Sequence, residues 1–74
     1  MPKLPRVSGK EVKHALERAG FREVSQKGSH VKMRHDDGRT VIIPMHSELA
    51  PGTLRSILRQ ARLTVEEWLE LLKG

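Results

Sequence analysis

The sequence contains no cysteine and no tyrosine, and it has one phenylalanine and one tryptophan among its 74 residues. Without cysteine there is no disulfide, no thiolate zinc cluster and no cysteine nucleophile. So few aromatic residues also exclude a base-stacking platform of the kind that RRM domains use for RNA. The apolar runs are far shorter than the roughly 20 residues that span a bilayer, and no signal peptide is visible. We therefore predict a cytoplasmic protein with no membrane segment and no cofactor.

What the sequence does contain is an excess of positive charge. Its 14 Lys and Arg residues outnumber its 9 Asp and Glu residues, which gives a formal net charge of +5. The whole excess lies in residues 1–47, because residues 48–74 carry equal numbers of both signs. A basic excess favours a polyphosphate partner and predicts salt-sensitive binding. Many small proteins are basic, however, so charge alone is equally compatible with a solvated surface that has no partner.

The local sequence signals predict the element order α-β-β-β-α-α. Ser8 and Glu11 form a capping box that starts the first helix, and Gly20 ends it. Turn signals at 27–28 and 36–38 separate three short strands. The predicted elements are a helix over 9–19, strands over 21–26, 29–35 and 39–43, a helix that starts near 51, and a last helix that starts after the capping residue 64.

Short neighbouring strands joined by tight turns form an antiparallel sheet, and helices then cover one of its faces. We therefore predict a single α+β domain over residues 1–74 with a three-stranded antiparallel sheet. This order is that of the double-stranded-RNA-binding fold with an extra C-terminal helix. Because a fold does not define a function, the function has to be inferred from particular residues.

Histidine is the main candidate for chemistry, because its side chain exchanges protons near neutral pH. His30 begins the second strand directly after Gly28 and Ser29, and strand alternation puts it on one face with Lys32 and Arg34. A phosphate on that face would meet an acid–base group and two cations. The same pattern is typical of the solvated face of a half-buried sheet, which on spacing alone is the more frequent explanation.

The other three histidines have simpler explanations. His14 lies off the apolar stripe of the first helix, His35 lies at the core edge of the sheet, and His46 either contacts RNA or caps the helix that follows. The histidine spacing matches no zinc-binding pattern, so we predict no metal site. The second helix carries a basic stripe that consists of Arg55, Arg59 and Arg62. Three explanations fit such a stripe: contact with RNA phosphate, contact with an acidic protein, or a solvated helix face, which is the most frequent.

Three motifs together resemble a known family. They are Gly28-Ser29-His30, Pro44-Met45-His46 and the long run from Gly52 to Ala61, which continues into Leu63–Leu69. With Gly20-Phe21 after the capped first helix, they are similar to the HicA (YcfA-like) family from about Ser8 to Leu72. The sequence departs from the family pattern at Arg62, where glycine is common, and at Val31, where several members have a second histidine.

The resemblance implies a toxin of a type II toxin–antitoxin pair that acts as a translation-independent endoribonuclease on mRNA. The single functional histidine of the family falls on His30. Its antitoxin, HicB, covers that histidine and usually carries a DNA-binding region, so contact with DNA is indirect. We therefore predict a catalytic His30 that works without metal. The predicted RNA contacts are Gly28, Ser29, Lys32, Arg34, Lys10 and Lys27.

Two other classes remain open on the sequence. A non-catalytic RNA-binding module of the double-stranded-RNA-binding type would use the same basic face without cutting its ligand. A subunit that binds only protein would dock the basic face against an acidic antitoxin. Replacement of His30 would abolish activity only if the protein is an enzyme.

Overall fold

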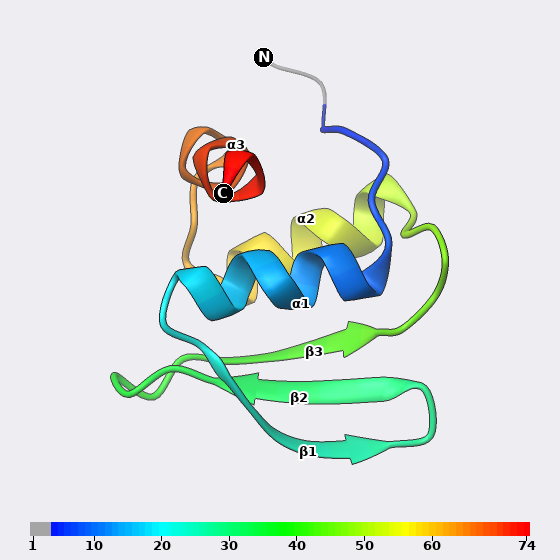
Figure 1. The fold of residues 1–74 in the computed structure, drawn as a ribbon, viewed down its shortest axis with the longest axis vertical. Coiled ribbons are helices and arrows are strands. Elements are labelled where there is room, and N and C mark those ends of the chain that lie inside the picture. The colour runs from blue at the N-terminus through cyan, green and yellow to red at the C-terminus, as the bar shows by residue number, and fades with distance from the viewer. Residues whose placement is uncertain (1–3) are drawn as a thin grey trace.

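Within residues 4–74, which the computed structural model describes, the elements follow the order predicted from the sequence (Figure 1). None of the helices in this part of the chain is long and apolar enough to cross a membrane. Each strand boundary lies within one residue of its prediction. The elements are α1 (Gly9–Arg18), β1 (Arg22–Lys27), β2 (His30–Arg34), β3 (Thr40–Pro44), α2 (Pro51–Ala61) and α3 (Val65–Lys73).

Capping residues fix where α1 begins and ends. The Ser8 hydroxyl accepts the Glu11 N–H at 3.1 Å, and the Glu11 carboxylate accepts the Ser8 N–H at 2.9 Å. This reciprocal pair satisfies N–H groups that have no partner within the helix. Gly20, with a φ of +97°, takes the left-handed conformation just past the helix end. The predicted capping box and glycine stop are both confirmed.

The same capping arrangement opens α3. The Thr64 hydroxyl accepts the Glu67 N–H at 3.0 Å, and the Glu67 carboxylate accepts the Thr64 N–H at 2.9 Å. The Thr64 N–H that the carboxylate accepts is the main cause that lowers the pKa of Glu67, and the Thr64 side chain lowers it further. A carboxylate in the first turn also interacts favourably with the helix dipole. The second predicted capping box is therefore confirmed.

The sheet is antiparallel with the strand order β1-β2-β3. A two-residue turn joins β1 to β2, and its first central residue, Gly28, has a φ of +58°. The turn between β2 and β3 contains Gly38 with a φ of +96°. Both positions favour glycine because a Cβ atom is strained there. On the outer edge of β3, the Gln60 side chain accepts the Ile42 N–H at 3.2 Å, so α2 protects that edge.

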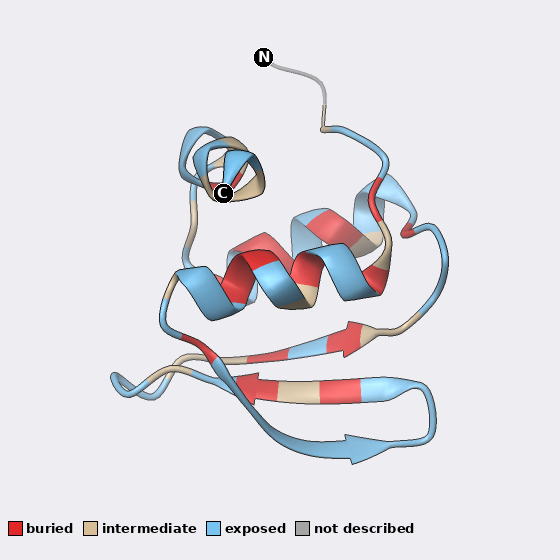
Figure 2. Cartoon of the chain, viewed as in Figure 1, coloured by how far each residue is buried: buried red, intermediate tan, exposed pale blue. Residues whose placement is uncertain are grey.

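The core lies between one face of the sheet and the helices. Figure 2 shows buried positions alternating along β2 and β3, whereas β1, the strand farthest from the helices, is exposed throughout. Trp68 of α3 is fully buried, and the Arg18 guanidinium donates two hydrogen bonds, at 3.0 and 2.6 Å, to the Leu71 carbonyl. The α+β architecture with helices on one face is therefore confirmed. The sheet contributes Val31, Met33, Val41 and Ile43 to the core.

The turn between β2 and β3 is anchored to the C-terminal end of α2. The Arg39 guanidinium donates to the Ala61 carbonyl at 2.6 Å and lies 5.1 Å above the centre of the Phe21 ring. It also pairs with Asp37, and this hydrogen bond is the main cause that lowers the pKa of Asp37. The His35 ring packs edge-on against Phe21 at 5.2 Å. These contacts agree with the structural role predicted for His35.

Arg62 follows α2 in the left-handed conformation, with a φ of 57° and a ψ of 40°. The left-handed region costs a residue with a Cβ roughly 1–2 kcal/mol, and Arg62 is the only described non-glycine residue that has a positive φ. We expect Arg62→Gly to raise the free energy of unfolding by about 1 kcal/mol, since part of the gain is offset by unfolded-state entropy. Urea unfolding measures this change. Arg59→Gly, inside α2, should instead lower the free energy of unfolding by about 1 kcal/mol. A lower free energy of unfolding in both variants would show that Arg62 is not strained by its left-handed conformation.

Candidate nucleic-acid interface

The face of the sheet turned away from the helices carries its side chains in three cross-strand rows. Residues paired across antiparallel strands point to the same face, and the register fixes which residues share a row. The first row is Lys27, His30 and Pro44; the second is Ser25, Lys32 and Ile42; the third is Arg22, Arg34 and Thr40.

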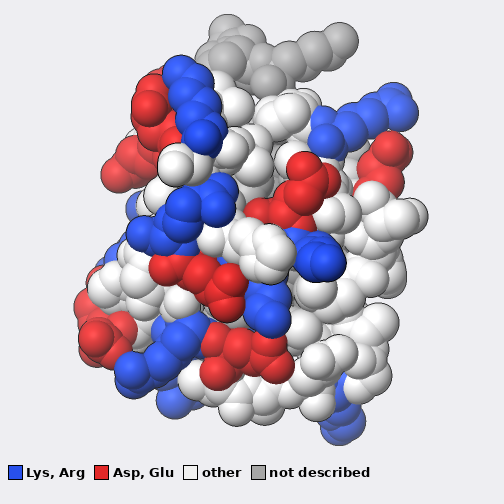
Figure 3. Space-filling model, viewed as in Figure 1, with Lys and Arg blue, Asp and Glu red and all other residues white. Residues whose placement is uncertain are grey.

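These rows carry four Lys or Arg residues and no Asp or Glu. One of the cations, Arg22, has its charge partly compensated by Asp36 at 3.1 Å, from the neighbouring loop. The side of the molecule seen in Figure 3 differs, because there Lys and Arg side chains lie next to Asp and Glu side chains. The outer sheet face is therefore the better surface for a polyanion.

His30 lies at one end of this face and is exposed. Its imidazole makes no hydrogen bond with any residue in the described part of the chain. A Cβ placed on the preceding Gly28 would have no atom within 4 Å. The space beside the turn is thus open, and a ligand can reach His30 without displacing a side chain.

The two cations that follow His30 along β2 lie at different distances from it. At about 3.4 Å per residue, the Lys32 backbone is about 7 Å and the Arg34 backbone about 14 Å from that of His30. The Arg34 Nε also donates to the Thr40 hydroxyl at 3.4 Å. Lys32 is near enough to reach a phosphate at His30, whereas Arg34 is placed for a phosphate farther along the strand. The spacing along β2 therefore favours two separate phosphate contacts, whereas the shared face alone predicted one phosphate held by both cations.

The N-terminus of α1 reaches the same end of the sheet as His30. The Gly9 N–H donates to the His46 carbonyl at 2.9 Å, and Met45, the next residue back, donates its N–H to the Ser29 carbonyl at 2.6 Å. Lys10, in the first turn of α1, is exposed beside this junction. The structure therefore gathers most of the predicted contacts at one end of the sheet: Lys10, Lys27, Gly28, Ser29, His30 and Lys32.

Gly9 permits this close approach of helix and sheet. A Cβ at Gly9 would overlap the Pro44 carbonyl oxygen and lie 2.8 Å from the Met45 Cα. Both are backbone atoms that cannot swing aside, so we expect Gly9→Ala to lower the free energy of unfolding by about 1–3 kcal/mol. Thermal unfolding measures the loss. The control is Gly52→Ala, where a Cβ meets nothing within 4 Å, and a loss of equal size there would contradict the steric explanation.

The other candidate residues from the sequence do not lie in this cluster. His14 is exposed on α1. His46 does not cap α2, because the N-cap is Ala50 and no side chain bonds to the cap, so that alternative from the sequence analysis is wrong. Arg55 and Arg59 are exposed on α2, which packs on the opposite side of the sheet, whereas Arg62 lies just past the end of this helix, so the predicted stripe keeps only two residues on the helix. Among residues 4–74, no three His, Cys, Asp or Glu side chains are grouped as metal ligands would be.

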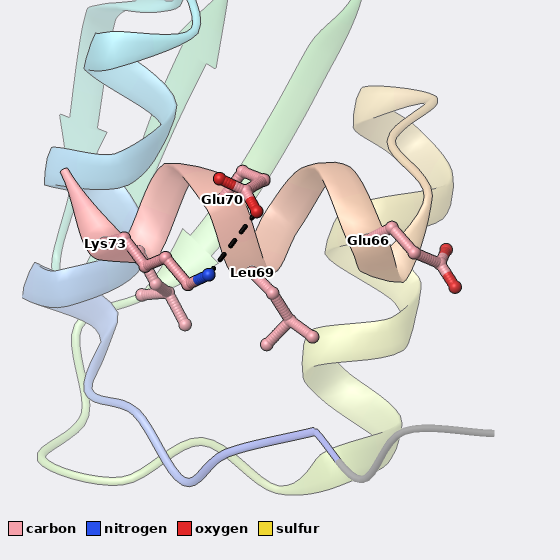
Figure 4. A pocket seen from close by; sticks show the side chains of 5 residues that line it. Glu66, Leu69, Glu70 and Lys73 are labelled. Carbon is pink, nitrogen blue, oxygen red and sulfur yellow. Dashed lines mark hydrogen bonds and ion pairs between the residues drawn. The ribbon is translucent and has the colours of Figure 1, made fainter.

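A hollow that is open and largely apolar lies along α3, away from this face (Figure 4). The Lys73 ammonium pairs with the Glu70 carboxylate at 3.4 Å across its rim. It contains no histidine and no nucleophile, so it offers less chemistry than the outer sheet face. Its lining residues are Glu66, Leu69, Glu70, Leu72 and Lys73.

Fold and surface together define a small α+β domain whose open sheet presents a basic face with an accessible histidine. A family model described as the HicA toxin of bacterial toxin–antitoxin systems matches residues 9–63. The match covers α1 to the end of α2, including the whole sheet, and the chain belongs to the HicA toxin family. Such toxins belong to toxin–antitoxin pairs, so an antitoxin partner is implied. Among curated proteins, none matches the chain.

Proposed function

We propose that the protein is a toxin of the type II class that acts as an endoribonuclease on mRNA in the cytoplasm. The observation that carries the proposal is the exposed His30 at the end of a sheet face that has cations in every row and no carboxylate. An mRNA strand laid along this face would pass Arg34 and Lys32 before reaching His30. Ile42, which is 40% exposed beside Lys32, offers apolar surface to a nucleobase.

The proposed reaction requires no metal ion. His30 removes the proton from a ribose 2′-hydroxyl, the 2′-oxygen attacks the neighbouring phosphorus, and the bond from phosphorus to the 5′-oxygen breaks. A cyclic phosphate forms on one fragment and a 5′-hydroxyl on the other. Lys27 and Lys32 flank His30 on the same face and would stabilise the negative charge that develops on the phosphoryl oxygens.

The antitoxin is proposed to be a HicB protein that inhibits by covering His30. Because RNA and antitoxin would compete for the same basic face, an acidic antitoxin surface fits it by charge. Contact with DNA would then occur only through the antitoxin.

The second candidate is a non-catalytic RNA-binding module. One observation favours it: the outer face is basic whether or not His30 reacts, and no described side chain orients the His30 ring by a hydrogen bond. Such a module would retain RNA without shortening it. Measurement of both binding and cleavage separates the two candidates.

The test of the proposed function is incubation of the purified protein with mRNA transcripts in the presence of EDTA. We expect discrete cleavage and fragments that end in a cyclic or 3′-phosphate. Fragments with 3′-hydroxyl ends only would contradict the mechanism. Retention of intact RNA on the protein would favour the binding module instead.

A further inference from the structure

The pairing between β2 and β3 continues beyond the last regular residue of β3. His30 is paired with Pro44, and one residue farther on the Met45 N–H donates to the Ser29 carbonyl at 2.6 Å. This bond follows the same antiparallel register as the pairs within the sheet. The chain is therefore still alongside the β1–β2 turn when it reaches His46.

Alternation along this extended segment places His46 on the outer face. Ile43 is buried, and Met45 is half-buried against the core. Pro44 lies between them on the outer face, so the following outward position is His46, which is exposed. His46 is then the diagonal neighbour of His30, and diagonal neighbours have Cβ atoms about 7–8 Å apart or less.

The backbone of His46 is held in place while its side chain is not engaged. Its carbonyl accepts the Gly9 N–H at 2.9 Å, which joins it to the start of α1. Its imidazole, like that of His30, makes no hydrogen bond with any residue from 4 to 74. His35 shows the opposite behaviour, since its Nδ1 accepts the Asp37 N–H at 3.1 Å and its ring packs on Phe21.

We propose that His46 is the general acid for the cleavage in which His30 is the general base; this inference rests on the proposed function. His30 accepts the proton of the 2′-hydroxyl while the bond between the 2′-oxygen and phosphorus forms. The imidazolium of His46 donates its proton to the 5′-oxygen as the bond between that oxygen and phosphorus breaks. The products are a cyclic phosphate and a 5′-hydroxyl, and exchange of protons with solvent resets both rings.

A second histidine on the same face allows one ring to act as the base and the other as the acid in the same step. A base must begin the step deprotonated and an acid must begin it protonated, and a group with a pKa near neutrality can do either. A separation of at most about 7–8 Å between Cβ atoms lets both rings reach the same phosphodiester. The register thus places an acid–base pair around a single phosphate.

The experiment compares wild type, His46→Ala and His30→Ala on two forms of one oligoribonucleotide. The oligonucleotide spans a cut site first mapped in a transcript that the wild type cleaves. In the second form, sulfur replaces the 5′-bridging oxygen at the cut, and the departing thiolate needs no proton. We expect His46→Ala to lower the rate on ordinary RNA by about 10²–10⁴-fold, and on the sulfur form to come within about tenfold of wild type. His30→Ala stays slow on both forms, because the 2′-hydroxyl still needs a base.

Two outcomes overturn the inference while the proposed function stands. One is cleavage of ordinary RNA by His46→Ala at the wild-type rate, and the other is an equally slow reaction on both forms. Failure of the wild type to cut any transcript overturns the proposed function itself, and this inference with it. The exposed His14→Ala is the control and should match wild type on both forms. If His46→Ala fails to unfold cooperatively, His46→Gln is used in its place.

Discussion

Replacement of His30 by alanine is expected to lower the rate of RNA cleavage by about 10²–10⁴-fold, the usual contribution of a general base. The physical reason is that His30 is the accessible acid–base side chain in the first row of the basic face, between Lys27 and Pro44. Stability should change by no more than about 0.5 kcal/mol, because the side chain is exposed and makes no hydrogen bond with the described residues. Single-turnover cleavage of a labelled transcript measures the rate.

The matched control for this variant is His14→Ala, which removes an exposed histidine from α1. It should cleave RNA as fast as wild type. RNA affinity of His30→Ala should fall only modestly, because Lys27, Lys32 and Arg34 remain on the face. Undiminished cleavage by His30→Ala would refute its role as the base, and a loss of binding as large as the loss of rate would show that His30 holds the RNA rather than accepting its proton.

Trp68→Ala is expected to give the largest loss of stability, about 3–5 kcal/mol. The Trp68 side chain is 0% exposed and joins α3 to the core. A domain of 74 residues has a total stability of only about 4–11 kcal/mol, so the variant should be barely folded at room temperature. Differential scanning calorimetry should show a midpoint lowered by at least about 12 °C.

Trp68→Phe separates packing from hydrogen bonding at the same position. The buried Nε1 of Trp68 has no hydrogen-bond partner among the described residues, so its removal costs no bond. We expect Trp68→Phe to lose roughly half or less of what Trp68→Ala loses, because much of the ring volume stays. Equal losses in the two variants would show that packing volume is not what Trp68 contributes. Because α3 lies outside the sheet face, folded Trp68→Phe should still cleave RNA.

Local signals predicted the elements well because each boundary is set by a few neighbouring residues. The capping boxes at Ser8 and Thr64 and the turn glycines at 28 and 38 act over three or four positions. Local signals could not predict how α3 packs, because its contact with α1 joins Arg18 to Leu71, 53 positions apart in the sequence. Arg62 also adopts a left-handed conformation that its residue type does not favour.

The candidate site was only partly predictable for a related reason. Alternation along one strand placed His30, Lys32 and Arg34 on a common face, but it did not show which residues of β1 and β3 lie beside them. The neighbourhood of His46 depends on the register between β2 and β3. The turn at 36–38 sets that register, and counting outward from it pairs residue 30 with residue 44. Arg22 could not be found by such a count. A regular count from the β1–β2 turn would pair Arg34 with residue 23, but the irregularity between Glu23 and Ser25 shifts the register by one residue and places Arg22 beside Arg34.

The most direct test of the account is the growth of bacterial cells after induced expression of wild type and of His30→Ala, with mRNA ends mapped in both cultures. The account predicts growth arrest with mRNA cleavage for wild type, and normal growth with intact mRNA for His30→Ala at equal protein level. Arrest by both proteins with intact mRNA would contradict it, because toxicity would then come from binding rather than from cleavage at His30.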